Sequence, residues 1–238
     1  MAKNKLEQFK KFSSFDFTFE PDFNEFFKTD YHLKGKWNKE VFKNNNPIVL
    51  ELGCGKGEYA TNLALQNPNK NFIGVDIKGN RMWKGANLAY EENLNNIAFL
   101  RTQIEFIDSF FAKNEVDEIW ITFPDPQLKK RRNKKRLTSA LFLNKYKTFL
   151  NTDCFVNLKT DNTVLYNYTL NLLKENALEI NISTNDLYME KNQGISELSE
   201  AKSIKTFYEK LYLEKGEKIK FIKFKLNKKN IDEPKTEE

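Results

Sequence analysis

The sequence predicts an α/β fold in which a mostly parallel sheet of seven strands is flanked by helices. Short apolar runs of strand length recur along the chain, and amphipathic segments of helix length separate most of them. Such alternation is typical of βαβ units, whose strands are parallel and buried on both faces. At 238 residues the chain is long enough for one well-packed domain and too short for two large ones.

The predicted elements follow one another in a regular order. The chain opens with an N-terminal arm, residues 1–46, which is aromatic and charged but has no steady period. Residues 47–228 form the predicted domain, and the polar tail, residues 229–238, is expected to fray. We expect strands at 47–51, 71–76, 97–100, 118–123, 154–158, 178–182 and 218–226, and helices near 56–66, 80–94, 138–150 and 162–176.

Composition excludes several classes of protein. No run of about 18 apolar residues is present to span a bilayer, and residues 1–12 lack the apolar core of a secretory signal. Two cysteines, Cys54 and Cys154, provide neither a disulfide framework nor a CxxC metal site. We therefore expect a cytoplasmic protein with no membrane partner and no metal. The formal net charge of +6 favours a polyanionic partner.

A glycine-rich turn follows the first strand of the domain. It reads Glu51-Leu-Gly53-Cys-Gly55-Lys-Gly57 and leads into a helix-forming segment. Glycine lets the backbone approach a ligand closely, and a helix N-terminus offers free N–H groups. The spacing G-x-G-x-G differs from the dinucleotide fingerprint G-x-G-x-x-G, and the preceding acid would repel a pyrophosphate. The turn therefore predicts a different nucleotide-like cofactor.

The pattern E-x-G-x-G-x-G resembles motif I of the Rossmann-like class I methyltransferases, which use S-adenosylmethionine. In that family the acid meets the cationic methionine end of the cofactor, which implies this role for Glu51, beside Gly53 and Gly55. Asp76 ends the second strand of the domain, where its carboxylate can accept both ribose hydroxyls. After the third strand the family usually has an acid, and this chain has Gln103, whose amide can hydrogen-bond the adenine edge.

A strongly basic loop follows the fourth predicted strand. Pro124-Asp125-Pro126 leads into residues 129–136, of which seven of eight are Lys or Arg. Ligands of open α/β sheets bind beyond the carboxyl ends of the strands, so we expect this loop beside the transferred methyl group. Its charge density suits phosphates and predicts a nucleic acid as the acceptor. In isolation, such a basic run is more often a solvated helix face.

F-P-D-P followed by K-K-R and a basic run resembles the tRNA (guanine-N7-)-methyltransferase family. Two further motifs agree: its strand-five K-T-D is present at residues 159–161, and a T-x-x-E element is present at residues 206–209. The resemblance covers about residues 47–226 and departs from the family at Gln127-Leu128, where a tryptophan is usual. It implies that Glu51, Asp76, Gln103 and Asp125 border the cofactor, and that Lys129, Asp161, Thr206, Phe207, Tyr208 and Glu209 contact tRNA.

The same resemblance implies methyl transfer to N7 of a guanine, at position 46 of the tRNA variable loop, with S-adenosylhomocysteine as the other product. Guanine N7 carries a free lone pair at neutral pH, so positioning should supply most of the catalysis. Asp125 is the candidate catalytic residue, because it can accept the guanine N–H groups and offset the charge that methylation creates. Structural roles are open for three of these residues: Asp161 as a helix N-cap, and Phe207 and Tyr208 as core aromatics.

Three other functions stay open at this point. An exocyclic-amine RNA methyltransferase typically has N/D-P-P-Y/F after strand four. A noncatalytic RNA-binding protein on this scaffold has no need for acids at both Glu51 and Asp76. A small-molecule methyltransferase has no need for the basic loop. The sequence does not decide between a monomer and a homodimer.

Overall fold

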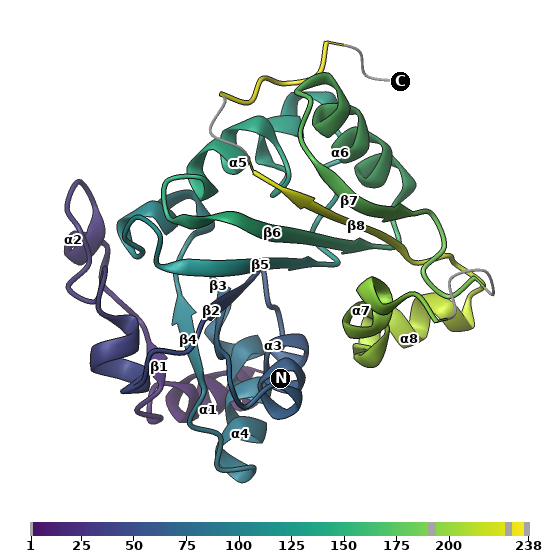
Figure 1. The fold of residues 1–238 in the computed structure, drawn as a ribbon. Helices are drawn as coiled ribbons and strands as arrows, with labels where there is room; N and C mark the ends of the chain where they lie inside the picture. The colour runs from purple at the N-terminus through teal and green to yellow at the C-terminus, as the bar shows by residue number, and fades with distance from the viewer. Residues whose placement is uncertain (1, 190–193, 227–229, 236–238) are drawn as a thin grey trace. The chain divides into compact units, whose positions relative to one another are not determined.

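The computed structural model describes residues 2–189, 194–226 and 230–235 (Figure 1). The chain divides into two compact units, residues 1–119 with 148–151 and residues 120–147 with 152–238. The unit boundaries fall within β5 (Val116–Thr122) and β6 (Leu150–Thr160). The described residues form eight strands, and the predicted α/β class is confirmed.

The first unit contains four parallel strands in the order β1, β4, β3, β2. Their bounds are Thr18–Phe19 for β1, Ile48–Leu52 for β2, Asn71–Asp76 for β3 and Ile97–Arg101 for β4. All five residues of β2 are buried, as the continuous apolar run predicts for a strand covered on both faces. The eighth strand is β1, which is too short for its pattern to be seen in the sequence.

Helices complete the first unit. They are α1 (Ala2–Phe12), α2 (Phe23–Phe26), the π-helix η1 (Trp37–Phe42), α3 (Glu58–Gln66), α4 (Gly79–Glu91) and the 3-10 helix η2 (Ile104–Ser109). The predicted helices at 56–66 and 80–94 correspond to α3 and α4. Each connects two parallel strands, as a βαβ unit requires.

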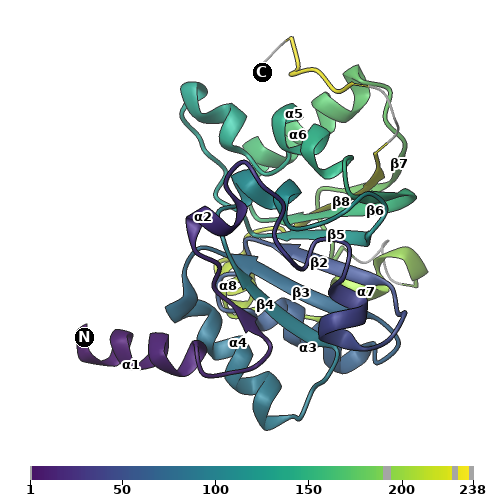
Figure 2. The same ribbon diagram turned by 90° about the vertical axis from the view of Figure 1, so that its left-hand side faces the viewer.

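The N-terminal arm is part of the core of the first unit. Helix α1 lies beside α4 (Figure 2), and β1 pairs with β4. Phe12 and Trp37 are fully buried, and the Trp37 indole Nε1 donates to the Phe110 carbonyl at 2.9 Å. These aromatic side chains pack on residues far along the chain, which explains why the arm shows no local period.

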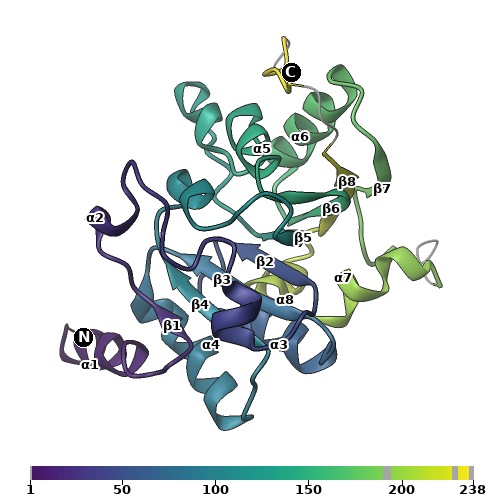
Figure 3. The ribbon, with the colours of Figure 1, turned by 60° about the vertical axis from the view of Figure 1, so that its left-hand side comes forward.

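The second unit contains β6 together with β8 (Lys220–Lys225) and β7 (Ile180–Thr184), both of whose pairings are antiparallel. Helices α5 (Ala140–Tyr146) and α6 (Thr163–Glu175) lie on one side of these strands. The opposite side carries α7 (Ser199–Ser203) and α8 (Phe207–Glu214) (Figure 3). The remaining helices of this unit are the 3-10 helices η3 (Lys130–Lys135) and η5 (Ser196–Leu198).

The C-terminal tail was expected to fray, and this is wrong for residues 230–235. Ile231 is buried, its carbonyl accepts from the Asn144 amide at 2.7 Å, and its N–H donates to Asn144 Oδ1 at 3.0 Å. Asn176 makes a second reciprocal pair with the backbone of Asp232. Because amide side chains of α5 and of the residue after α6 supply these partners, the polar composition of the tail does not reveal its order.

Among the residues that the structure describes, no helix is both long enough and apolar enough to cross a membrane. Nor do the described residues place three or more His, Cys, Asp or Glu side chains together in a way that could hold a metal ion.

Candidate functional site

The glycine turn of the first unit has the backbone shape that its sequence predicts. Gly53, Gly55 and Gly57 have φ values of 77°, 56° and 70°, in the left-handed region that favours glycine. The N–H groups of Gly53 and Cys54 both donate to the Val75 carbonyl, at 2.8 and 3.0 Å. The turn that follows β2 is thereby fixed to the end of β3.

Another glycine, Gly85 in the middle of α4, presses against this turn. A Cβ atom on Gly85 would lie 2.8 Å from Gly57 Cα, closer than real Cβ atoms come to backbone. Gly85 also donates its N–H to the Lys56 carbonyl at 2.8 Å. Backbone contact with α4 therefore helps to set the position of the turn. A glycine inside a helical pattern is the signal that could have revealed this contact in the sequence.

Two carboxylates border the turn. Glu51 is buried at the end of β2, and its Oε2 accepts from the Ala60 N–H at 2.8 Å in the first turn of α3. Asp76 ends β3, with Oδ2 accepting from Gly55 N–H and Oδ1 from Lys78 N–H, each at 2.9 Å. A carboxylate offers about four lone-pair sites, so the two backbone contacts of Asp76 leave acceptor capacity for a ligand.

Cys54 reports on the electrostatics of the turn. Its thiol is buried, and burial raises its pKa well above the usual range, with a further rise from the charges of Glu51 and Asp76. Both acids therefore act on the same small volume. The negative potential of this volume and the glycine backbone around it fit a ligand with a cationic amino-acid end and a ribose diol. They disfavour a phosphate group.

Gln103 lies at the same edge of the first unit. It directly precedes η2, and the Thr102 N–H beside it donates to the Asp76 carbonyl at 3.1 Å. The Gln103 side chain is exposed. The structure thus brings Gln103 close in the fold to the strand end that carries Asp76, while its contact with a cofactor stays a prediction.

In the second unit, Asp125 lies in a strained turn. Its Oδ1 accepts from the Gln127 N–H at 3.0 Å, and the side chain is exposed. Phe123 and Gln127 both have φ of +47°, an uncommon value for residues other than glycine. Phe123 is held by stacking on Tyr212, with ring centroids 6.0 Å apart, and by its N–H, which donates to the Lys159 carbonyl at 2.8 Å. Such strain persists only where the surroundings enforce it.

The basic loop divides into an exposed part and a buried residue. Its exposed members are Lys129, Lys130, Arg131, Arg132, Lys134 and Lys135. Arg136, predicted to add to the same charged surface, is only 3% exposed. Its guanidinium donates to the Pro126 carbonyl at 3.0 Å and to the Gln127 carbonyl at 3.4 Å. Six basic side chains, rather than seven, therefore form the exposed cluster.

The K-T-D and T-x-x-E motifs meet in a buried ion pair. Lys159 Nζ lies 2.8 Å from Glu209 Oε2, and both side chains are fully buried. Lys159 also donates to the Ala201 and Ile204 carbonyls, while the Tyr188 hydroxyl donates to Glu209 Oε1 at 2.6 Å. Burial lowers the pKa of Lys159 to about 8, despite the opposing effect of Glu209. Through Lys159 and Tyr188, the buried Glu209 carboxylate thus attaches α8 to the rest of the second unit. The contact of Glu209 with RNA stays a prediction.

The other motif residues on α8 are more accessible. Thr206 caps the helix, with its Oγ1 accepting from the Glu209 N–H at 3.2 Å. Phe207 and Tyr208 are 48% and 44% exposed, so the alternative that they are core aromatics is wrong. Both rings lie in the first turn of α8, with their centroids 5.6 Å apart.

Asp161 ends the K-T-D motif just after β6. It is half-buried, and burial raises the pKa of its carboxyl. Its carbonyl accepts from Lys220 Nζ at 2.9 Å. The alternative that Asp161 caps α6 is wrong, because Asn162 does so by accepting from the Leu165 N–H at 2.9 Å.

Comparison with known proteins identifies the family. A family described as "Putative methyltransferase" matches residues 45–222. A tRNA (guanine-N(7)-)-methyltransferase of Christiangramia forsetii is 52% identical over 94% of this chain and 99% of its own length. One of Bacteroides fragilis is 48% identical over 95% of this chain and 87% of its own. The chain belongs to the tRNA (guanine-N7-)-methyltransferase family.

Solved structures confirm the predicted Rossmann-like methyltransferase fold of this family member. The 16S rRNA methyltransferase KamB aligns with a TM-score of 0.57 at 14% identity, over 79% of this chain and 92% of that one. The 16S rRNA (adenine(1408)-N(1))-methyltransferase of Catenulisporales acidiphilia has a TM-score of 0.55 at 14% identity, over 84% of this chain and 94% of that one. At these identities the likeness concerns the fold alone.

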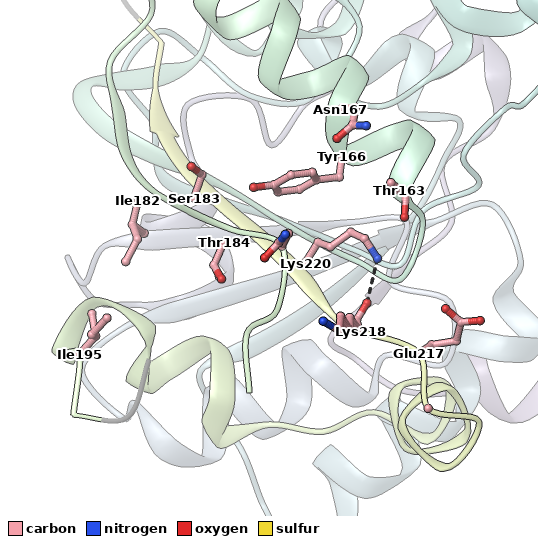
Figure 4. A pocket seen from close by; sticks show the side chains of 12 residues that line it. Thr163, Tyr166, Asn167, Ile182, Ser183, Thr184, Ile195, Glu217, Lys218 and Lys220 are labelled. Atoms are coloured by element: carbon pink, nitrogen blue, oxygen red, sulfur yellow. Dashed lines mark hydrogen bonds between the residues drawn. The ribbon is translucent and has the colours of Figure 1, made fainter. Parts of the chain in front are cut away.

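A cavity of about 830 Å³ opens in the second unit of this methyltransferase between the start of α6, β7 and the segment before β8 (Figure 4). Lys220 lines it and donates to the Lys218 carbonyl at 3.0 Å, as well as to Asp161. None of the residues predicted for the site lines this cavity. It therefore adjoins the K-T-D motif without including it.

Proposed function

We propose that the chain transfers the methyl group of S-adenosylmethionine to N7 of a guanine in tRNA, namely guanine 46 of the variable loop. The products are 7-methylguanosine and S-adenosylhomocysteine. The observation that carries this proposal is the 52% identity to a tRNA (guanine-N(7)-)-methyltransferase, which extends over nearly the full length of both chains.

The first unit supplies the residues that would hold the cofactor. Glu51 would attract the ammonium group of its methionine part, and Asp76 would accept from the ribose hydroxyls through the lone pairs left by its two backbone contacts. Gly53 and Gly55 would let the backbone approach, and Gln103 would meet the adenine edge. When bound, the cofactor supplies an electrophilic sulfonium methyl group.

Asp125 is the residue we assign to the guanine. Only one of its carboxylate oxygens is used inside the turn, by the Gln127 N–H, so the other can accept from guanine N1–H and N2–H₂. This orients N7 and offsets the positive charge that develops on the purine. No group has to remove a proton from N7, so the protein would act mainly by positioning N7 against the methyl group.

The exposed basic cluster, with Lys129 at its start, would contact the phosphates of tRNA. Its side chains are accessible, and Lys and Arg at this density favour a polyanion. Phe207 and Tyr208 present exposed rings on which a base can stack. Burial raises the pKa of the Tyr212 phenol, and the nearby charge of Asp161 raises it further. Asp161 would contact the RNA beside α8.

The test is methyl transfer to unmodified tRNA, followed by nucleoside analysis of the product. We expect 7-methylguanosine from wild-type tRNA and none from a tRNA with adenine at position 46. Asp125→Asn should retain binding of S-adenosylhomocysteine, measured by calorimetry, and lose about tenfold or more in turnover. A product methylated at N2 or N6 would instead establish an exocyclic-amine methyltransferase, and full turnover in Asp125→Asn would remove this residue from the mechanism.

A further inference from the structure

Arg136 differs from the other basic residues of its loop in where its charge lies. Its side chain is turned inward, and its guanidinium donates to the carbonyls of Pro126 and Gln127. These are the two residues that follow Asp125 in the chain. A buried guanidinium binds carbonyl oxygens more strongly than an exposed one, because water does not compete. Arg136 thus holds the backbone of the turn that carries Asp125.

The guanidinium also stacks on an aromatic ring of α6. Arg136 Cζ lies 4.2 Å from the ring centroid of Tyr168, within the range of a cation–π contact. Arg136 forms no ion pair with a carboxylate among the described residues. The two carbonyls and the face of this ring therefore offset its charge.

Tyr168 connects Arg136 to the C-terminal tail. The Tyr168 hydroxyl donates to Glu233 Oε2, and Glu233 Oε1 accepts from the Ala140 N–H at 3.1 Å, at the start of α5. A carboxylate acceptor increases the electron density of the phenol, which strengthens its attraction for the cation above the ring. The carboxylate of a tail residue thereby acts on the catalytic turn through a single aromatic ring.

Hydrogen bonds on both sides of Glu233 hold the tail in place, as its contact with Tyr168 requires. Asn144 of α5 and Asn176, the residue that follows α6, each bind its backbone through two hydrogen bonds. The Lys235 N–H donates to Glu175 Oε2 at 2.9 Å, and the Ile231 side chain is buried. Glu233 lies between these anchors, so the position of its carboxylate is set from both sides.

We propose that Arg136 is a positioning residue for methyl transfer, not an RNA contact, and that Glu233 of the tail strengthens its hold on the catalytic turn through Tyr168. The inference rests on the proposed function in one respect, that Asp125 orients the guanine. It adds that the geometry of Asp125 depends on a segment about a hundred residues away in the sequence.

The test compares Arg136→Lys with Arg81→Lys, a matched change at an exposed arginine of α4 outside the proposed machinery. Lysine keeps the charge of Arg136 but lacks the planar guanidinium, which donates to the two carbonyls while its face stacks on Tyr168. We expect Arg136→Lys to lower kcat by about tenfold or more, with KM for tRNA and affinity for S-adenosylhomocysteine nearly unchanged. Arg81→Lys should match the wild type. An unchanged kcat with a raised KM for tRNA would overturn the proposal and make Arg136 an RNA contact.

The role of the tail is tested by Tyr168→Phe, Glu233→Ala and the double variant. Phenylalanine keeps the ring of Tyr168 and removes only its hydrogen bond to Glu233. Each single change should lower kcat about three- to tenfold. The double variant should lose no more kcat than the more damaging single change. Additive losses would overturn the coupling. Amide hydrogen exchange of Gln127, whose N–H donates to Asp125, should accelerate in all three.

The exchange measurement separates this inference from the proposed function. If the wild type made no 7-methylguanosine, the proposed function would fail, and slow exchange of the Gln127 amide that accelerates in Tyr168→Phe would still support the part played by the tail. If the wild type is active and neither kcat nor exchange responds to Arg136→Lys or Tyr168→Phe, the inference fails and the proposed function stands.

Discussion

Gly85→Ala tests how the glycine turn at residues 53–57 is positioned. Here the change should destabilise the protein, the opposite of its usual effect inside a helix. In the interior of a helix, replacing glycine by alanine usually stabilises a protein by about 1 kcal/mol. In α4 the added Cβ would lie 2.8 Å from Gly57 Cα and 2.9 Å from the Gly57 carbonyl carbon and oxygen. These atoms are backbone, so no side chain can rotate away to make room.

The two effects can be compared in magnitude. Overpacking a well-filled site costs about 1–3 kcal/mol, which cancels or exceeds the gain in helix propensity. We expect Gly85→Ala to be destabilised by up to about 2 kcal/mol. Relief of the clash must move the turn, so affinity for S-adenosylhomocysteine should fall by about tenfold, equivalent to roughly 1.4 kcal/mol. Gly57→Ala should be worse by a further 1–2 kcal/mol or so, because its φ of +70° also strains a side chain.

Urea unfolding and calorimetric titration with S-adenosylhomocysteine measure the two quantities. Gly216→Ala is the matched control for Gly57→Ala: Gly216 has φ of +76° but no atom within 4 Å of a Cβ, so this variant reports backbone strain without a clash. If Gly85→Ala proved about 1 kcal/mol more stable than the wild type and bound the ligand equally well, the contact would have no role in positioning the turn.

Two further predictions concern the second unit. Glu209→Ala leaves the fully buried ammonium of Lys159 without its carboxylate and should lower the free energy of unfolding by about 3–5 kcal/mol, whereas Glu209→Gln, which keeps an acceptor, should cost less; equal urea midpoints for Glu209→Ala and the wild type would contradict this. Replacing Arg131 and Arg132 together by alanine should weaken tRNA binding and reduce the slope of log affinity against log salt by roughly 1.5–2, and an unchanged slope would mean that neither side chain meets a phosphate.

Local patterns were enough to predict the scaffold of the proposed cofactor site. Strands β2 and β3 are continuous apolar runs, and their ends carry Glu51 and Asp76. The spacing of glycines between β2 and α3 dictates left-handed backbone, which the structure shows. These features depend on residues near one another in the chain, so their physical causes can be read from the sequence.

The partner of each charged motif residue could not be predicted in this way. Glu209 and Lys159 are fifty residues apart in the sequence and fully buried together, although the motifs that contain them suggest surface roles. Burial of a charge depends on whether an opposite charge and hydrogen-bond partners reach it. Those partners come from β6, α7, α8 and the loops beside them, which only the packed unit brings together.

In the basic loop, too, some features follow from the sequence and others depend on the tertiary structure. The sequence by itself determined that seven cationic side chains would follow β5, that glycines would shape the turn after β2 and that acids would border it. Only the tertiary structure decided that Arg136 would leave the charged surface to hold the carbonyls beyond Asp125, and that a polar tail would be ordered at Glu233. The physical reason is that the orientation of a charged side chain is set by the carbonyls, rings and carboxylates that meet it. For Arg136 the carbonyls belong to its own loop, but the ring of Tyr168 comes from α6 and the carboxylate of Glu233 from the tail.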